Sequence, residues 1–313
     1  MNEKETFLKE MGSCKGPFYH IIGNIDEPSL KEIDKIYGAA DRLSIENAKK
    51  HKKILLALSI LGPLISFAFL IYDEGEVYSL IIVCILLLIF LFLIQKHANN
   101  LDCHRKFLEY RVLAESLRLQ FFLSYAGINK RVEELLPWFI KKGIPWIEDI
   151  LRTLPISEVK EKKSIVYYWI LDQKTYHEEA LAKAEKRKAR DERISRIVIF
   201  ITIMFYVLGL LFEIYMYFYS PNIDATFIRV ILKVVIGSMS VSALFIESYY
   251  GKMSLSETIN DHKRMISLYR KVERMILKQG ETEELILYLA KEFLVENSTW
   301  YAYQSKNKAE LVL

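Results

Sequence analysis

The sequence lacks the patterns that build disulfide frameworks, metal centres and common catalytic sites. Its 313 residues include three cysteines, Cys14, Cys84 and Cys103, an odd number without metal-type spacing. The six histidines are scattered, and there is no glycine-rich phosphate loop, nucleophile elbow or metal-ligand cluster. These absences argue against a disulfide framework and a zinc site. They predict a protein that is not an enzyme, with no catalytic residue, metal or cofactor.

Strand signals and a cleavable signal peptide are also missing. The first 53 residues are polar, and the apolar segment after them is long and ends in no small-residue cleavage site. We therefore expect that segment to remain as a signal anchor. The net charge of +4 is mild, and the basic residues cluster beside apolar segments. Membrane orientation and lipid headgroups explain this charge better than nucleic-acid binding does.

What the sequence does contain is a strong segregation of its 52% hydrophobic from its 26% charged residues. Four apolar windows approach the ~20 residues that a helix needs to span hydrocarbon: Ile54–Tyr72, Tyr78–Gln95, Ile197–Phe218 and Phe227–Tyr249. The alternative is four buried helices of a soluble core, but windows this long and apolar are rare there. The sequence predicts an all-α membrane protein with four transmembrane helices in two hairpins and a cytoplasmic helical bundle.

Basic residues mark one side of these windows. They precede the first window in "NAKKHKK", follow the second between Lys96 and Lys106, and precede the third in "KAEKRKARDERISR". The connecting turns, expected at Asp73–Glu76 and Ser220–Asp224, contain no Lys or Arg. Because loops rich in Lys and Arg stay in the cytoplasm, both termini and the central segment are predicted to be cytoplasmic.

The resulting organisation uses one design twice, a basic helix entering a hairpin and an amphipathic helix leaving it, without a residue-level repeat. The segments are a cytoplasmic arm and pre-membrane helix (1–53), hairpin 1 (54–95), a cytoplasmic helical block (96–195), hairpin 2 (196–250) and cytoplasmic C-terminal helices (251–313).

The helix after the first hairpin should be packed on more than one side. One apolar seam has a spacing of three and four residues, at Phe107, Tyr110, Ala114, Leu117, Phe121, Ser124 and Ile128. A second apolar flank contains Leu108, Val112, Leu119 and Phe122. Gly127 is the expected stop.

Three further helical regions are expected. Pro137, Gly143 and Pro145 predict short helices. Pro155 and Ser157 predict the start of a long helix that runs unbroken into the third window. Gln279-Gly280 should separate the last two helices.

Two polar constellations are candidate ligand sites. Arg111, Glu115 and Arg118 share one helix face. They form either an ion-pair set that fixes a partner helix or an arginine site for a ligand phosphate. Gln173, Tyr176 and His177 lie within about one turn of each other, as either a buried polar cluster between helices or part of the same ligand site.

A third constellation is spaced by four residues on the last helix, at Glu292, Glu296 and Trp300. Trp300 fits a core anchor better than a stacking platform for a ligand.

Charged residues also occur inside the second hairpin. Arg229, Lys233, Gly237, Ser240 and Glu247 form one stripe on the fourth window, and Thr202, Tyr206, Gly209 and Glu213 form a matching stripe on the third. Helical rise predicts that Glu213 pairs with Lys233. The charges either pin the hairpin, with the glycines allowing close packing, or line a pore and set its ion preference.

The stretch "HRKFLEYRVLAESLRLQFFLSYAGI" resembles the helix after a membrane hairpin in the SLATT families, the SMODS- and SLOG-associated membrane effectors. "LDQKTYHEEALAKAEKRKARDERI" is similar to the pre-membrane helix of that family, and "LAKEFLVENSTWYAY" to its closing helix. The resemblance covers about residues 35–308 in the four-span form. The matching positions are Tyr110, Arg111, Ala114, Glu115, Arg118, Gln173, Tyr176, His177, Glu296 and Trp300.

The resemblance implies a bacterial anti-phage effector of the inner membrane that acts by abortive infection. It implies a homo-oligomeric ion channel, with a tetramer favoured, controlled by a nucleotide signal and causing depolarisation or growth arrest. The four-span form is also similar to the membrane component of Hailong-type systems, whose partner is a nearby nucleotidyltransferase making DNA oligomers. A nucleotide or short DNA oligonucleotide is therefore the expected ligand.

Two functions from different classes remain on the sequence evidence. The first is a ligand-gated channel, and the second is a non-conducting membrane scaffold that recruits a cytoplasmic partner. A small transporter is disfavoured because neither hairpin contains a broken helix with a central polar site.

Overall fold

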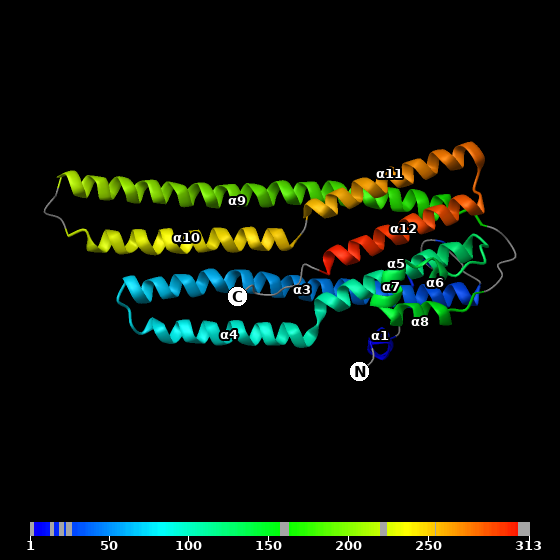
Figure 1. The fold of residues 1–313 in the computed structure, drawn as a ribbon, viewed down its shortest axis with the longest axis horizontal. Coiled ribbons are helices and arrows are strands. Elements are labelled where there is room, and N and C mark those ends of the chain that lie inside the picture. Colours follow the sequence, from blue (N-terminus) through cyan, green and yellow to red (C-terminus); the bar gives the residue numbers. More distant parts are fainter. Residues whose placement is uncertain are drawn as a thin grey trace. The chain divides into compact units, whose positions relative to one another are not determined.

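The computed structural model describes residues 3–12, 16–18, 22, 27–156, 163–219, 224–253 and 255–305. Every regular element in these ranges is helical, which confirms the all-α prediction (Figure 1). The chain divides into two compact units. The described residues of the bundle unit lie within 1–50, 102–182 and 258–308, and those of the span unit lie within 51–101 and 183–257.

The described elements follow the order predicted from the windows and helix breakers. They are α1 (Glu3–Met11), α3 (Pro28–Glu74), α4 (Leu80–Leu101), α5 (Cys103–Tyr125), α6 (Val132–Leu135), α7 (Trp138–Gly143), α8 (Pro145–Thr153), the π-helical turn η1 (Val166–Leu171), α9 (Asp172–Tyr219), α10 (Thr226–Lys252), α11 (Leu255–Gln279) and α12 (Glu283–Gln304).

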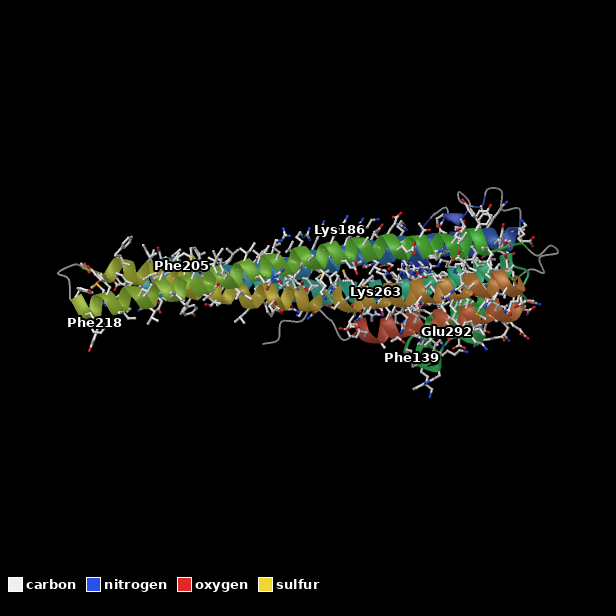
Figure 2. All side chains as sticks on the ribbon, turned by 90° about the horizontal axis from the view of Figure 1, so that it is seen from above. Phe139, Lys186, Phe205, Phe218, Lys263 and Glu292 are labelled. Carbon is white, nitrogen blue, oxygen red and sulfur yellow. The ribbon has the colours of Figure 1, made fainter. Side chains whose placement is uncertain are left out.

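Four helical segments are long and apolar enough to cross a membrane, and they contain the four predicted windows. Their most apolar stretches are poorly buried. In the segment of α3, 22% of the residues of this stretch are buried, and in each of the other three segments 6% are. Aromatic side chains such as Phe218 project outward from α9 (Figure 2). This exposure contradicts the alternative of four helices buried in a soluble core, because apolar surface on this scale needs lipid or another chain to cover it.

Within the span unit, α10 approaches both α3 and α9 closely at glycines. A Cβ atom added to Gly62 of α3 would lie 2.1 Å from Cζ of Phe245 of α10. A Cβ atom added to Gly237 of α10 would lie 2.7 Å from Cδ1 of Leu70. At Gly209 of α9 the corresponding distance to Cδ1 of Ile236 is 3.3 Å. Small residues therefore let these helices pack closely.

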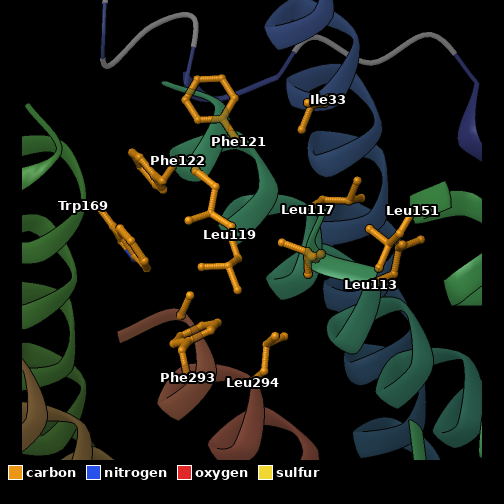
Figure 3. Packing of buried hydrophobic residues seen from close by; sticks show 14 of the residues in the cluster. Ile33, Leu113, Leu117, Leu119, Phe121, Phe122, Leu151, Trp169, Phe293 and Leu294 are labelled. Atoms are coloured by element: carbon orange, nitrogen blue, oxygen red, sulfur yellow. The ribbon is translucent and has the colours of Figure 1, made fainter. Parts of the chain in front are cut away.

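The core of the bundle unit surrounds α5, which is buried on several faces as predicted. All seam residues are buried except Phe107, which is half-buried, and the second apolar flank is buried as well. Phe122 stacks on Trp169 with ring centroids 5.4 Å apart, and α12 closes the core through Phe293 and Leu294 (Figure 3). This packing fixes the polar side chains of α5 in place.

Two glycines end helices where the sequence predicts. Gly127 follows α5 with a φ of 71°, and Gly280 follows α11 with a φ of 78°. Both values lie in the left-handed region, which glycine adopts without a Cβ penalty. Thr282 then caps α12 by accepting a hydrogen bond from the Leu285 amide at 3.3 Å.

The predicted start of the long helix at Pro155 and Ser157 is wrong. Pro155 is not helical, Ser157 lies outside the described residues, and the helix begins at Val166. Glu281, distant in sequence, binds this end: its carboxylate accepts from Ser164 Oγ at 2.5 Å and from the Ile165 amide at 3.2 Å. From Val166 the helix continues into the third window without interruption, as expected.

The first turn also differs from its prediction. Asp73 and Glu74 belong to the last turn of α3, and the connection comprises residues 75–79. The Gly75 amide still donates to the Ile71 carbonyl at 3.1 Å, so the helix extends through the acidic residues. In the second turn only Asp224 is described, and it accepts from the Thr226 amide at 3.0 Å; residues 220–223 lie outside the described ranges.

Candidate functional site

Residues of the three sequence constellations line one cavity of about 110 Å³ in the bundle unit. We call it the arginine cavity. Its walls come from α5 (Arg111, Glu115, Arg118), α9 (Tyr176, His177), α11 (Thr258, Asp261, His262) and α12 (Phe293, Glu296, Asn297, Trp300). The packing of α5 against α12 therefore brings together groups that lie nearly two hundred residues apart in the chain.

The two arginines are held by carboxylates. Arg111 Nη1 lies 3.0 Å from Asp41 Oδ1 on α3, and Arg111 Nη2 lies 2.6 Å from Glu115 Oε1. The second oxygen of Glu115 contacts Arg118 Nη2. Glu115 thus bridges both guanidinium groups, and the link to Asp41 fixes α3. These contacts support the structural interpretation, and they also orient the arginines rigidly toward the cavity.

Arg118 retains binding capacity. Its guanidinium lies over the Phe293 ring, 5.0 Å from the centroid. The side chain is only 8% exposed, and its buried Nε has no hydrogen-bond acceptor among the described residues. Because a buried donor without an acceptor is costly, an acceptor such as a phosphate oxygen is favoured at this position.

A histidine pair forms a second polar wall. Nδ1 of His177 and Nδ1 of His262 are 3.0 Å apart, so one nitrogen donates and the other accepts. Burial, reinforced by His262 and both arginines, lowers the pKa of His177 to about 3. Burial also lowers the pKa of His262. The pair is therefore neutral near pH 7 and offers hydrogen bonds rather than charge.

The Glu296 side chain has a charge that can change near neutral pH. Burial, reinforced by the nearby Asp261, raises its pKa to about 7. Arg264, with its Nη2 at 3.7 Å from the Glu296 carboxylate, acts in the opposite direction. The carboxyl group is thus partly protonated near pH 7, and it can either accept or donate a hydrogen bond.

Two of the sequence candidates lie outside the cavity lining. Gln173 is buried, but its amide donates to Asp172 at 2.9 Å, and its Oε1 has no donor among the described residues. Glu292 is exposed on α12 (Figure 2). Trp300, in contrast, both lines the cavity and packs edge-on against Phe107 with centroids 5.7 Å apart.

Sequence reasoning missed Asp261, His262 and Asn297. Asp261 and His262 lie in a polar helix that has no motif, and only the packing of α11 brings them next to the residues of α9 and α5. Asn297 follows Glu296 directly, and it is buried. It lies three residues before Trp300, so it could have been found as a neighbour of Trp300 on the same helix face.

The predicted pairing of Glu213 with Lys233 in the span unit is wrong. Glu213 forms two bonds to Arg229, 2.8 Å from its Nε and 2.9 Å from its Nη2. Lys233 Nζ binds Glu74 Oε2 at 2.7 Å. The reason is that α3 extends to Glu74 and supplies a carboxylate that a hairpin of two helices does not have. Both pairs nonetheless join neighbouring helices.

The predicted stripes of the third and fourth windows face each other in part, since Lys233 and Gly237 of the fourth window contact α3 instead. The hydroxyl groups of Tyr206 on α9 and Ser240 on α10 are 3.1 Å apart, and the Ser195 hydroxyl donates to the Glu247 carboxylate at 3.2 Å. Thr202 is buried and donates to the Val198 carbonyl at 2.8 Å. A polar track therefore runs along the contact between α9 and α10.

The described part of the chain thus contains a polar cavity with aromatic walls in the bundle unit, and ion pairs from Glu213 to Arg229 and from Glu74 to Lys233 that join helices of the span unit. Comparisons with models of protein families, with curated proteins and with solved structures found no match to this chain.

Proposed function

We propose that this chain is an anti-phage effector of the bacterial inner membrane, in which a nucleotide or short DNA oligonucleotide bound in the arginine cavity controls an oligomeric ion channel. The observation that carries the proposal is the convergence of Arg118, His177, Glu296 and Trp300 on one cavity. These residues come from all three stretches that resemble the SLATT families. The partner enzyme would be a nucleotidyltransferase that makes the signal.

The chemistry of the cavity supports a ligand with both a phosphate and a flat ring. Guanidinium groups bind phosphate oxygens with charge-assisted hydrogen bonds, and Arg118 keeps a donor for this purpose. Trp300 and Phe293 offer aromatic surface, and Asn297 offers an amide. Two arginines face three carboxyl groups, including Asp261. This balance disfavours a site for a bare, highly charged anion. Because the cavity measures about 110 Å³, it fits one phosphate or base of a nucleotide rather than the whole molecule.

The span unit supports a channel through its uncovered surface. Four helices from one chain, arranged as two hairpins, are too few to enclose a water-filled pore. Their apolar stretches are also mostly exposed. Several copies would cover that surface, and the polar track between α9 and α10, with Ser240, would lie near the pore. Glu213, Arg229 and Lys233 would then lie at its outer mouth and influence ion selectivity.

The experiment is ion flux through liposomes that contain the purified chain, measured with and without deoxynucleotides and short oligodeoxynucleotides. We expect a conductance that one of these ligands changes, and that Trp300→Ala makes insensitive to it. Trp138→Ala is the matched control, because Trp138 is 71% exposed and lies outside the cavity.

An absence of ion flux under every condition would refute the channel. It would favour the second function, a membrane scaffold that recruits a cytoplasmic partner. If flux occurs but the Trp138 and Trp300 variants respond alike, the channel stands and the arginine cavity is not its ligand site.

A further inference from the structure

A second cavity lies in the span unit, where α3, α9 and α10 meet the ends of their apolar windows. It measures about 370 Å³. We call it the interfacial cavity. Besides Ile194, its lining residues are Lys52 of α3, Arg187, Arg190 and Asp191 of α9, and Tyr249 and Tyr250 of α10. None of these residues belongs to the arginine cavity.

The position of this cavity follows from the sequence of the windows. Lys52 comes just before the window that begins at Ile54, and Arg190 comes two turns before the window that begins at Ile197. Tyr249 is the last residue of the window that begins at Phe227. The lining residues therefore lie at the start of two windows and at the end of the third. In the predicted topology these ends are on the same side of the membrane, at the boundary between hydrocarbon and headgroups.

The charges in the cavity are arranged to hold an anion. Three basic side chains face one carboxylate, that of Asp191, which is 5% exposed. Asp191 lies 3.6 Å from Arg187 Nε and 3.2 Å from Arg190 Nη2, so it fixes both guanidinium groups. Asp191 neutralises only one of the three positive charges. The Arg190 side chain remains 67% exposed and can reach a ligand.

Two further features fit an amphipathic ligand. Tyr249 and Tyr250 are neighbouring tyrosines at the end of a membrane window, the position where such side chains contact headgroups. Burial lowers the pKa of Lys52, and the nearby Arg187 lowers it further. A bound anion would relieve this repulsion between positive charges.

We propose that the interfacial cavity binds the phosphate group of an anionic phospholipid. Basic pockets between membrane helices take acidic headgroups, and the fork of an arginine binds a phosphate in a defined orientation. The apolar windows below the cavity would contact the acyl chains of the same lipid. This role needs the chain to lie in a membrane, but it does not depend on the ligand of the arginine cavity or on ion conduction.

The test compares lipid binding by the full chain and by two matched double variants in mild detergent. Phosphatidylglycerol or phosphatidylcholine is added, and native mass spectrometry counts the retained lipids while thermal unfolding reports stabilisation. Lys52→Gln with Arg190→Gln removes two cavity charges and leaves Arg187 to pair with Asp191. Lys53→Gln with Lys186→Gln removes the same charge from neighbouring exposed positions outside the lining.

We expect the unsubstituted chain to retain phosphatidylglycerol in preference to phosphatidylcholine and to be stabilised by it. The cavity variant should bind phosphatidylglycerol roughly tenfold more weakly than the control variant does, since it loses directed contacts as well as surface charge. Equal melting temperatures of the two variants in phosphatidylcholine would establish that both are folded.

The proposal is overturned if the unsubstituted chain shows no preference for the anionic lipid, or if the two variants bind it equally. A last set of measurements replaces the lipid with inorganic phosphate. If millimolar phosphate alone gives the same stabilisation and displaces phosphatidylglycerol, the cavity binds a soluble phosphate, and the assignment to lipid is wrong.

Discussion

At the scale of single residues, Glu296 connects the arginine cavity to pH. Burial and Asp261 raise its pKa to about 7, from an ordinary value near 4.5. A raised carboxyl pKa means that the folded chain binds a proton more tightly than the unfolded chain. The stabilisation from this proton is complete below the unfolded value and is lost as pH rises through 7.

Glu296→Gln should therefore change how stability depends on pH. Glutamine mimics the protonated carboxyl group, so the variant should gain stability relative to the unsubstituted chain as pH rises from 4.5 to 7. The gain should reach up to roughly 3 kcal/mol over this interval. Thermal unfolding in detergent at several pH values measures the difference between the two proteins.

Glu292→Gln is the control, because Glu292 is exposed on the same helix. Glu296→Gln should show a larger change of stability with pH than this exposed control does. Burial and His262 lower the pKa of His177 to about 3, an effect of opposite sign whose stabilisation is lost as pH falls. Because His177 is present in both proteins, it cancels from the difference. A constant difference for Glu296→Gln would show that this carboxyl group titrates normally.

At the scale of helices, close packing in the span unit depends on glycine. A Cβ atom at Gly62 would overlap the Phe245 ring, with 2.1 Å to Cζ. Gly251 near the end of α10 has no atom within 4 Å of such a Cβ. The two glycines thus give a matched pair for testing the contact between α3 and α10.

Gly62→Ala should destabilise the chain by about 1–3 kcal/mol, since overpacking forces the ring or the helix to move. Gly251→Ala should be neutral or slightly stabilising, because alanine favours helix. Melting temperatures in detergent measure both effects. Phe245→Leu should restore stability to the Gly62 variant. Equal melting temperatures for the two alanine variants would contradict this packing.

The ion pairs of the span unit give a second prediction at this scale. Glu213→Arg should destabilise the chain, because it places two guanidinium groups together, and Arg229→Glu in the same chain should restore stability. Lys233 of α10 forms a separate ion pair with Glu74 of α3. Failure of the double exchange to restore the melting temperature would argue against the observed pairing.

Ion flux through the double variant decides between the two roles of the pair. If the charges only pin the helices together, ion selectivity should be unchanged after the exchange. If they lie at the mouth of a pore, selectivity should change, because the fixed charges occupy exchanged positions. The corresponding exchange of Glu74 and Lys233 provides an independent comparison.

At the scale of the whole molecule, the distribution of Lys and Arg predicts cytoplasmic termini. In a cysteine-free background, a cysteine introduced at Val77 should react with an impermeant reagent added from outside. One at Ser305 should react only after the membrane is opened. Val77 lies in the connection after α3 and is exposed. The reverse labelling pattern would refute the orientation.

Assembly is the second prediction for the whole molecule. The mass of one chain is 36.8 kDa. Light scattering in mild detergent should give a multiple of this mass, with a tetramer favoured, because one copy leaves most of its apolar windows uncovered. A strictly monomeric mass in detergents that preserve folding would contradict the oligomer and therefore the proposed channel.

Local patterns were sufficient to predict much of the fold. The apolar windows predicted the four membrane-length helices, because twenty apolar residues in sequence can bury themselves in few other ways. The spacing along α5 predicted its burial. Gly127 and Gly280 predicted two helix ends, because a positive φ is a property of one residue and its immediate neighbours.

The tertiary structure decided what depends on residues distant in sequence. Glu281 binds the backbone before Val166 and sets the start of a long helix, and Glu74 rather than Glu213 pairs with Lys233. The packing of α11 brings His262 to His177, although no motif marks it. The sequence alone thus determined which segments are helical and apolar. The three-dimensional packing determined which polar groups meet, because ion pairs and cavities form between side chains that only folding brings together.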